Sequence, residues 1–254
     1  MSQLGARSFA IALGAVLSIA GIDGHGQGKP WTYAGRTGPA KWDTLNKDFA
    51  ACKEGYGQSP IDIPDASTRK GDFPPILFNY KPVPLKLIDK GHTLQLNYAR
   101  GSIATIDGVP YKLVQFDFHR PSEHKIDGKG HDMEVQLAHR GPDGKLVVIV
   151  VLLEAGRDNP FIKTLLNHLP KEKGKEIVVD GVKINAVNLL PNDKGYYAYT
   201  GSLTTPPCSE DVTWFILKST VPVAAGDLAR FGKAFPANAR PVQPVNGRDI
   251  RATP

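Results

Sequence analysis

Two segments near the middle of the chain alternate between apolar and polar residues. The first alternates Val114, Phe116 and Phe118 with Gln115, Asp117 and His119, and the second places Glu134 and Gln136 between apolar neighbours. A period of two sends successive side chains to opposite faces of a β-strand, so both segments are predicted to be strands with one polar face. Polar side chains on such a face need water, one another or a metal ion as partners.

Short apolar runs recur between scattered Pro and Gly residues, which is typical of a β-rich domain. They predict strands at 85–88, 93–98, 103–106, 112–119, 133–139, 146–153, 177–179, 196–199 and 212–217. The run 146–153 lacks alternation, as expected of a central strand covered on both faces. Asn159-Pro160 predicts the start of a helix that ends before Pro170, and a second short helix is expected around 226–235.

The N-terminal segment has the pattern of a secretory signal. Arg7 precedes an apolar run at 9–20, and Ser18 and Ala20 suit cleavage. We therefore expect a signal peptide at 1–20, a single domain at 21–254, and a periplasmic or secreted protein. No later run reaches the roughly 18 apolar residues of a membrane helix, so no membrane association is expected after signal removal.

The charge pattern argues against nucleic acid as a partner. The formal net charge of the whole chain is +6, and no basic cluster is interleaved with aromatic residues. We interpret the excess of positive charge as a solvated basic surface.

The polar strand pair resembles the active-site segment of the α-class carbonic anhydrases, Gln-x-His-x-His, then Glu-His, then Glu-x-His-x-x-His. Other matches span the chain: Trp31-Thr-Tyr33, Gly38-Pro39 with Trp42, Gln58-Ser-Pro-Ile-Asp-Ile63, Gly91-His92, Tyr199 to Glu210 and Asn238 to Arg248. The resemblance implies a mainly β domain with a large, mostly antiparallel, twisted central sheet and short peripheral helices.

The resemblance also implies roles for individual residues in the hydration of CO2 to bicarbonate. The zinc positions are Asp117, His119 and Gln136. Thr204 would bind the zinc hydroxide, Glu123 would orient Thr204, and His92 would relay the proton. The outer shell of the site would comprise Gln115, Glu134, His124 and Tyr199. The substrate would contact Val148, Leu203, Thr204, Thr205, Val212 and Trp214, while Ala138 replaces the usual Val of this wall.

The remaining histidines and the cysteines have structural interpretations. The resemblance implies that His124 and His139 are held in hydrogen bonds beneath the site, whereas His131 is expected to be solvated and His168 to be a surface or packing residue. Two cysteines in an exported chain favour a disulfide, and similar bacterial enzymes pair the positions of Cys52 and Cys208. Two separate buried thiols are the alternative.

Two of the three zinc histidines are replaced, and the replacements weaken the site. Asp117 would lower the net charge of the centre and so raise the pKa of bound water, and Gln136 offers only an amide oxygen. Gln115 and Glu134 remain, but the histidines they would orient are gone.

These replacements leave three functions open. The favoured one is a carbonic-anhydrase-related protein with little or no zinc, acting as a structural or ligand-binding domain. The second is a working carbonic anhydrase, a lyase, with an Asp/His/Gln metal site. The third is a site for another divalent metal with an esterase-like reaction.

Overall fold

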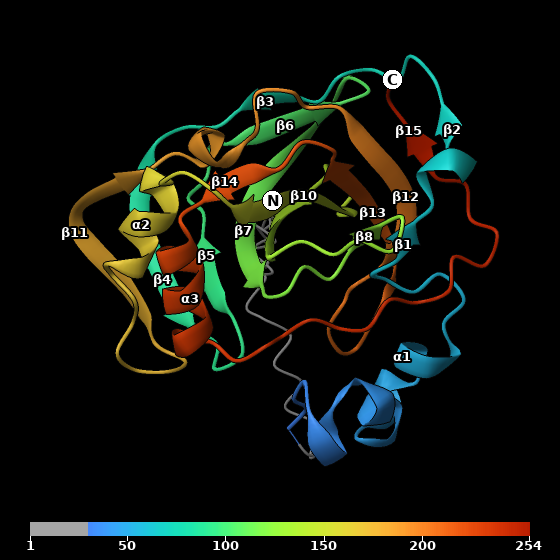
Figure 1. Cartoon of the computed structure of the whole chain (residues 1–254), viewed down its shortest axis with the longest axis horizontal. Helices are drawn as coiled ribbons and strands as arrows, with labels where there is room; N and C mark the ends of the chain where they lie inside the picture. Colours follow the sequence, from blue (N-terminus) through green and yellow to red (C-terminus); the bar gives the residue numbers. More distant parts are fainter. Residues whose placement is uncertain (1–29) are drawn as a thin grey trace, which may run out of the picture.

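A large, mixed, twisted β-sheet forms the body of the computed structural model, which describes residues 30–254 (Figure 1). Its neighbouring strands follow the order β11-β4-β5-β7-β9-β10-β13-β12-β15-β2, and most pairs are antiparallel. The parallel pairs in this sheet are β10 with β13, β10 with β14, and β15 with β2. The predicted fold class is confirmed, while the expected signal peptide at 1–20 lies outside the described residues.

The strands range in length from two residues to eleven. In chain order they are β1 (Asp62–Ile63), β2 (Arg69–Lys70), β3 (Leu77–Asn79), β4 (Val83–Asp89), β5 (Leu94–Asn97), β6 (Ile103–Ile106), β7 (Val109–His119), β8 (Lys125–Ile126), β9 (Met133–Arg140), β10 (Leu146–Ala155), β11 (Glu176–Ile184), β12 (Tyr196–Ser202), β13 (Glu210–Leu217), β14 (Val221–Val223) and β15 (Arg251–Ala252). β1 and β8 form a separate parallel pair.

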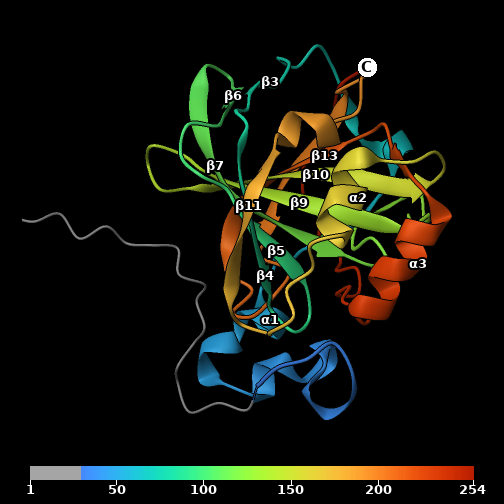
Figure 2. The same cartoon turned by 90° about the vertical axis from the view of Figure 1, so that its left-hand side faces the viewer.

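The helices are short and peripheral. They are α1 (Ala51–Glu54), α2 (Pro160–Leu166) and α3 (Ala225–Ala234), with 3-10 turns at Gly35–Thr37, Pro39–Thr44, Lys47–Phe49, Asp65–Ser67 and Ala186–Leu189. Asn159 caps α2, because its side chain accepts hydrogen bonds from the backbone N–H groups of Phe161 and Ile162, as predicted. Figures 1 and 2 show α2 and α3 side by side. No helix within 30–254 has the length and apolar character needed to cross a membrane.

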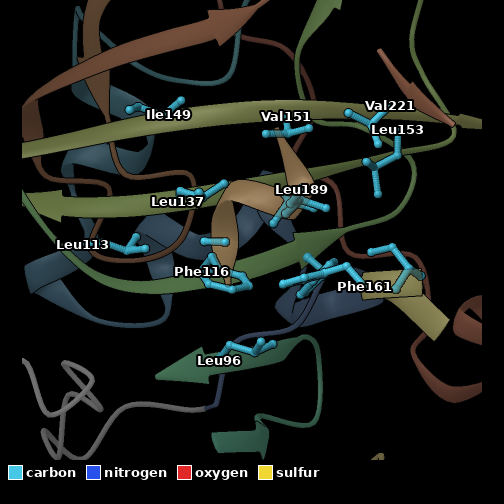
Figure 3. Close-up of a cluster of buried hydrophobic side chains, with 14 of the residues drawn as sticks. Leu96, Leu113, Phe116, Leu137, Ile149, Val151, Leu153, Phe161, Leu189 and Val221 are labelled. Carbon is cyan, nitrogen blue, oxygen red and sulfur yellow. The ribbon is translucent and has the colours of Figure 1, made fainter. Parts of the chain in front are cut away.

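Strand β10 separates two apolar cores. Val147, Ile149, Val151 and Leu153 belong to the larger cluster, whereas Val148, Val150 and Leu152 belong to a smaller one. Figure 3 shows Ile149, Val151 and Leu153 among other side chains of the larger cluster, which also includes Phe161 from α2. The unbroken apolar run is therefore a central strand buried on both faces, as predicted.

The alternation along β7 is interrupted by a β-bulge. The pairing of β7 with β9 shifts between Leu113 and Gln115, and Leu113 rather than Val114 is buried with Phe116 and Phe118 in the larger core. The expectation that Val114 shares their face is wrong because the bulge inserts one residue and so changes the phase of the pattern. Beyond the bulge the alternation holds.

A disulfide joins the N-terminal segment to the loop after β12. Cys52 on α1 is bonded to Cys208, 156 residues further along the chain, which confirms the predicted pairing. Arg240 reinforces this junction, since its guanidinium donates to the carbonyl oxygens of Cys52 and Ser59 and to the side-chain oxygen of Gln58.

Candidate active site

The three residues at the predicted zinc positions come from the adjacent strands β7 and β9. Asp117 lies opposite Gln136, and His119 lies opposite Glu134, in the antiparallel register. Because Asp117 and His119 are two residues apart on one strand, they share a face of the sheet. The register thus brings Asp117, His119 and Gln136 onto the same face.

His119 is buried and tightly held. Its Nδ1 lies 2.9 Å from the carbonyl oxygen of Asn238, which can only accept, so Nδ1 carries the proton and Nε2 is left as the possible ligand atom. Burial opposes protonation, but the carboxylates of Glu123 and Glu134 outweigh it and raise the pKa of His119. Asn238 also donates to the carbonyl oxygen of Phe118 and accepts from the backbone N–H of Arg120. The sequence placed Asn238 in a family motif but gave it no role.

Gln136 is buried and bridges two carboxylates. Its amide nitrogen donates to Glu123 Oε2 at 2.7 Å and to Glu134 Oε1 at 2.8 Å. Glu134 therefore lacks the ring N–H of a histidine, as expected, but the amide N–H of Gln136 takes its place as a donor. Both amide hydrogens are used in this way, so only the carbonyl oxygen of Gln136 could reach a metal.

Asp117 is half-buried and bonded to Gln115. Gln115 Nε2 donates to Asp117 Oδ2 at 3.0 Å. Burial raises the pKa of Asp117, although the Gln115 hydrogen bond partly offsets this. A ladder of amides continues from Gln115, since Gln95 donates weakly to Gln115 Oε1 at 3.4 Å and more closely to Asn97 Oδ1 at 2.6 Å.

Glu123 connects the strand pair to the threonine loop. Its Oε1 accepts from the backbone N–H of Arg240 at 2.8 Å, and its carboxylate accepts a hydrogen bond from the Thr204 side chain. Burial raises the pKa of Glu123. Thr204 and Glu123, which the resemblance pairs, are therefore in contact.

A second layer of hydrogen bonds lies beneath these residues. Glu134 accepts from the backbone N–H of His124 at 2.9 Å, and His124 Nδ1 lies 3.2 Å from Glu134 Oε1. The Tyr199 hydroxyl lies 2.8 Å from both His124 Nε2 and Ser59 Oγ. Burial alone would raise the pKa of Glu134, but His124 more than compensates and lowers it to about 2.

The residues predicted to contact substrate lie around the smaller apolar core. Val148, Val212 and Trp214 are buried in it, and Leu203 packs against it. Trp214 Nε1 donates to the carbonyl oxygen of Ser202 at 3.0 Å, which fixes the indole. Thr205 follows Thr204 in the same loop, and its carbonyl oxygen accepts from the backbone N–H of Cys208.

His92 belongs to an aromatic group near the N-terminal segment. Its ring centroid is 4.5 Å from that of Trp31 and 6.0 Å from that of Tyr33. The Tyr33 hydroxyl is buried and has no hydrogen-bond partner within 30–254. Burial raises the pKa of Tyr33, and the nearby charges of Glu123 and Asp117 raise it further. The sequence identified Tyr33 only as part of a family motif. The position of Tyr33 near the site depends on tertiary packing, which the sequence pattern does not show.

The other histidines are structural. His139 is buried and its Nε2 lies 2.7 Å from the Tyr80 hydroxyl, while His168 Nδ1 lies 2.8 Å from the Thr164 carbonyl oxygen. The expectation that His131 is solvated is wrong: its side chain is only 7% exposed and its Nδ1 lies 2.8 Å from Glu154 Oε1. The carboxylate of Glu154, 23 residues further along the chain, thus contacts His131 and shields it from solvent.

The chain is similar to known proteins over most of its length. The family model described as eukaryotic-type carbonic anhydrase matches residues 37–254. A carbonic anhydrase from Nostoc sp. is 40% identical over 223 residues, covering 86% of this chain and 84% of the relative. Within residues 30–254 no group of three or more His, Cys, Asp or Glu side chains could hold a metal ion.

Two solved structures show the same fold. The α-carbonic anhydrase of Thermovibrio ammonificans, in complex with the inhibitor sulfanilamide, has a TM-score of 0.83 and 36% identity, covering 88% of this chain and 99% of the other. Dioscorin complexed with ascorbate has a TM-score of 0.82 and 29% identity, and the match covers 88% of this chain and 98% of dioscorin.

Proposed function

Because the chain belongs to the eukaryotic-type, or α-class, carbonic anhydrase family, we propose that it is a carbonic-anhydrase-related protein with a degraded zinc site. It would hydrate CO2 weakly or not at all. The observation that carries this proposal is the position of Gln136, whose amide nitrogen is committed to Glu123 and Glu134.

The donor set does not fit the zinc of a hydrating site. In carbonic anhydrase itself, three neutral histidines leave the full charge of zinc to act on its water, whose pKa falls to about 7. Here the corresponding donors are the carboxylate of Asp117, Nε2 of His119 and the amide oxygen of Gln136. The carboxylate reduces the net charge of the centre, and the amide is a weak ligand for zinc.

The hydrogen bonds of the site support a stable, metal-free arrangement. Gln115 donates to Asp117, and Gln136 donates to both glutamates, so the polar groups around His119 satisfy one another. Buried polar groups are costly when unpaired, and this network removes much of that cost without a metal ion.

One observation favours the alternative, a working carbonic anhydrase with an Asp/His/Gln metal site. Thr204 still donates to Glu123, which is the contact that would orient a metal-bound hydroxide. Zinc would then be held by Asp117, His119 and Gln136, and His92 would be the proton relay. We rank this function second because it needs the weak amide oxygen of Gln136 as a ligand.

The non-catalytic role fits a ligand-binding or structural domain in the periplasm. One relative of the same fold was solved in complex with ascorbate, so a member of this fold can accommodate a small organic molecule. Localisation in the periplasm or outside the cell rests on the signal-like segment at 1–20, and CO2 or bicarbonate is the substrate only if the chain is active.

The test is metal analysis of protein purified without chelator, together with CO2 hydration measured by stopped flow with zinc supplied. We expect zinc well below one ion per chain and hydration near the uncatalysed rate. Thr204→Ala serves as the matched control, because it should change nothing in an inactive protein and should lower the rate of an active one. Stoichiometric zinc with turnover that Thr204→Ala abolishes would establish the alternative.

A further inference from the structure

A basic hollow of about 720 Å³ lies beside the end of β7, and its lining includes His131 and Glu154, the pair described above. Arg120, Lys125 and Lys129 contribute the positive charges of its lining, and Asp132 and Glu154 contribute the negative ones. Arg120 directly follows His119, and Lys125 begins β8. Three cations therefore face two carboxylates.

The two carboxylates are already engaged. Glu154 Oε1 lies 3.0 Å from Lys129 Nζ and 2.8 Å from His131 Nδ1, and Asp132 Oδ2 accepts from the backbone N–H of Ala155 at 2.8 Å. By contrast, neither Arg120 nor Lys125 has an acidic side chain within ion-pair distance in the described chain, 30–254. With Lys129 paired to Glu154, the hollow is left with Arg120, Lys125 and Asp132, which together carry one net positive charge.

Helix α3 is shaped to admit the Arg120 guanidinium. A Cβ added at Gly232 would meet Arg120 Nη1 at 2.5 Å and Cζ at 2.7 Å, so the guanidinium lies against the bare backbone of the helix. Gly232 is in the interior of α3, where glycine is less favourable than alanine. At Gly226, in the first turn of the same helix, an added Cβ would meet nothing within 4 Å.

We propose that the basic hollow binds a small oxyanion, a phosphate or a carboxylate group, through Arg120 with Lys125. A guanidinium presents planar paired donors that match the oxygens of either group, and an ammonium adds a mobile charge. This site is separate from the candidate zinc site and does not depend on the proposed function.

Isothermal titration calorimetry at constant ionic strength, set with sodium chloride, tests the proposal with two probes. Inorganic phosphate is titrated in one arm and acetate in the other, so that the arms distinguish a phosphate from a carboxylate ligand. We expect saturable binding of at least one probe, weakened at least about tenfold by Arg120→Gln, since a charge-assisted hydrogen bond is worth about 1.5 kcal/mol or more. Arg36→Gln, which changes an exposed arginine of the N-terminal segment, should bind like the wild type.

The glycine pair separates geometry from charge. Gly232→Ala should displace the Arg120 side chain and weaken binding severalfold, while Gly226→Ala should not, and neither changes the net charge. Both should keep the melting temperature at or above the wild-type value, because alanine favours the helix. Binding lost in Arg120→Gln but kept in Gly232→Ala would support the anion site and refute only the role of Gly232.

Two results would overturn the site: no saturable binding of either probe, or binding that survives Arg120→Gln. Neither result bears on CO2 hydration, so this proposal and the proposed function fail independently.

Discussion

Asp117 lies directly opposite Gln136 on the neighbouring antiparallel strands β7 and β9. Both side chains form hydrogen bonds with other residues of the protein. Asp117 accepts from Gln115, and Gln136 donates to Glu123 and Glu134. Asp117 and Gln136 therefore both belong to a hydrogen-bond network that stabilises the site from within.

Removal of the Gln136 amide should destabilise the fold. Gln136→Leu leaves the buried carboxylates of Glu123 and Glu134 without a shared donor, so we expect a loss of about 2 to 4 kcal/mol in the free energy of unfolding. Urea denaturation at neutral pH measures it. Gln243→Leu is the matched control, because the Gln243 side chain donates to an exposed backbone carbonyl, that of Pro241. Equal stability of Gln136→Leu and wild type would show that the bridge contributes nothing.

The buried imidazole of His139 should make stability depend on pH. Burial lowers the pKa of His139 to about 4, below the value of about 6.5 expected in the unfolded chain. The unfolded state therefore binds a proton first as the pH falls. The contribution is fully present above pH 6.5 and is lost between pH 6.5 and 4, by about 3 kcal/mol.

His139→Gln should flatten this part of the profile. It removes the titrating ring and its contact with Tyr80, so the variant should be less stable than wild type at pH 7.5 but should lose less stability between pH 7.5 and 4.5. His168→Gln, on α2's C-terminal side, retains His139 and should keep the wild-type slope. An unchanged slope in His139→Gln would assign the pH dependence to other groups.

Reduction of the disulfide should lower the melting temperature. Cys52 and Cys208 close a loop across 156 residues, and the chain-entropy model assigns roughly 4 to 5 kcal/mol to such a link as an upper value. Differential scanning calorimetry with and without dithiothreitol measures the effect. The Cys52→Ala, Cys208→Ala double variant should melt at the lower temperature under both conditions. A wild-type melting temperature indifferent to dithiothreitol, with reduction verified by thiol titration, would contradict this expectation.

Local patterns predicted the strands and helices well. The polar alternation of Gln115, Asp117 and His119 and the cap at Asn159 depend on neighbouring residues alone, and both are in the structure. The bulge at Val114 could not be predicted in the same way, because a bulge is a property of a strand pair and not of one strand.

The partners of the polar residues were harder to predict. His131 meets Glu154, and Tyr33 approaches Glu123 and Asp117, only after distant segments have packed together. The role of Gln136 was missed for a chemical reason. As a ligand it offers an oxygen, but its amide can also donate, and the sequence does not reveal which atom faces the two glutamates.

We propose that the site has lost two of its zinc ligands while the residues around them remain in place. Asp117→His together with Gln136→His should rebuild a three-histidine zinc site, because Gln115 and Glu134 remain in place to orient the new rings. Each single variant should recover far less, since two imidazoles and one weak ligand hold zinc loosely.

The most direct measurement is the rate of CO2 hydration, with zinc supplied, for the wild type, both single variants and the double variant. We expect a rate near background for the wild type, small gains for Asp117→His and Gln136→His, and a large gain for the double variant. A wild-type rate already as high as that of the double variant would contradict this expectation, and so would background rates in all four proteins when the double variant binds zinc stoichiometrically.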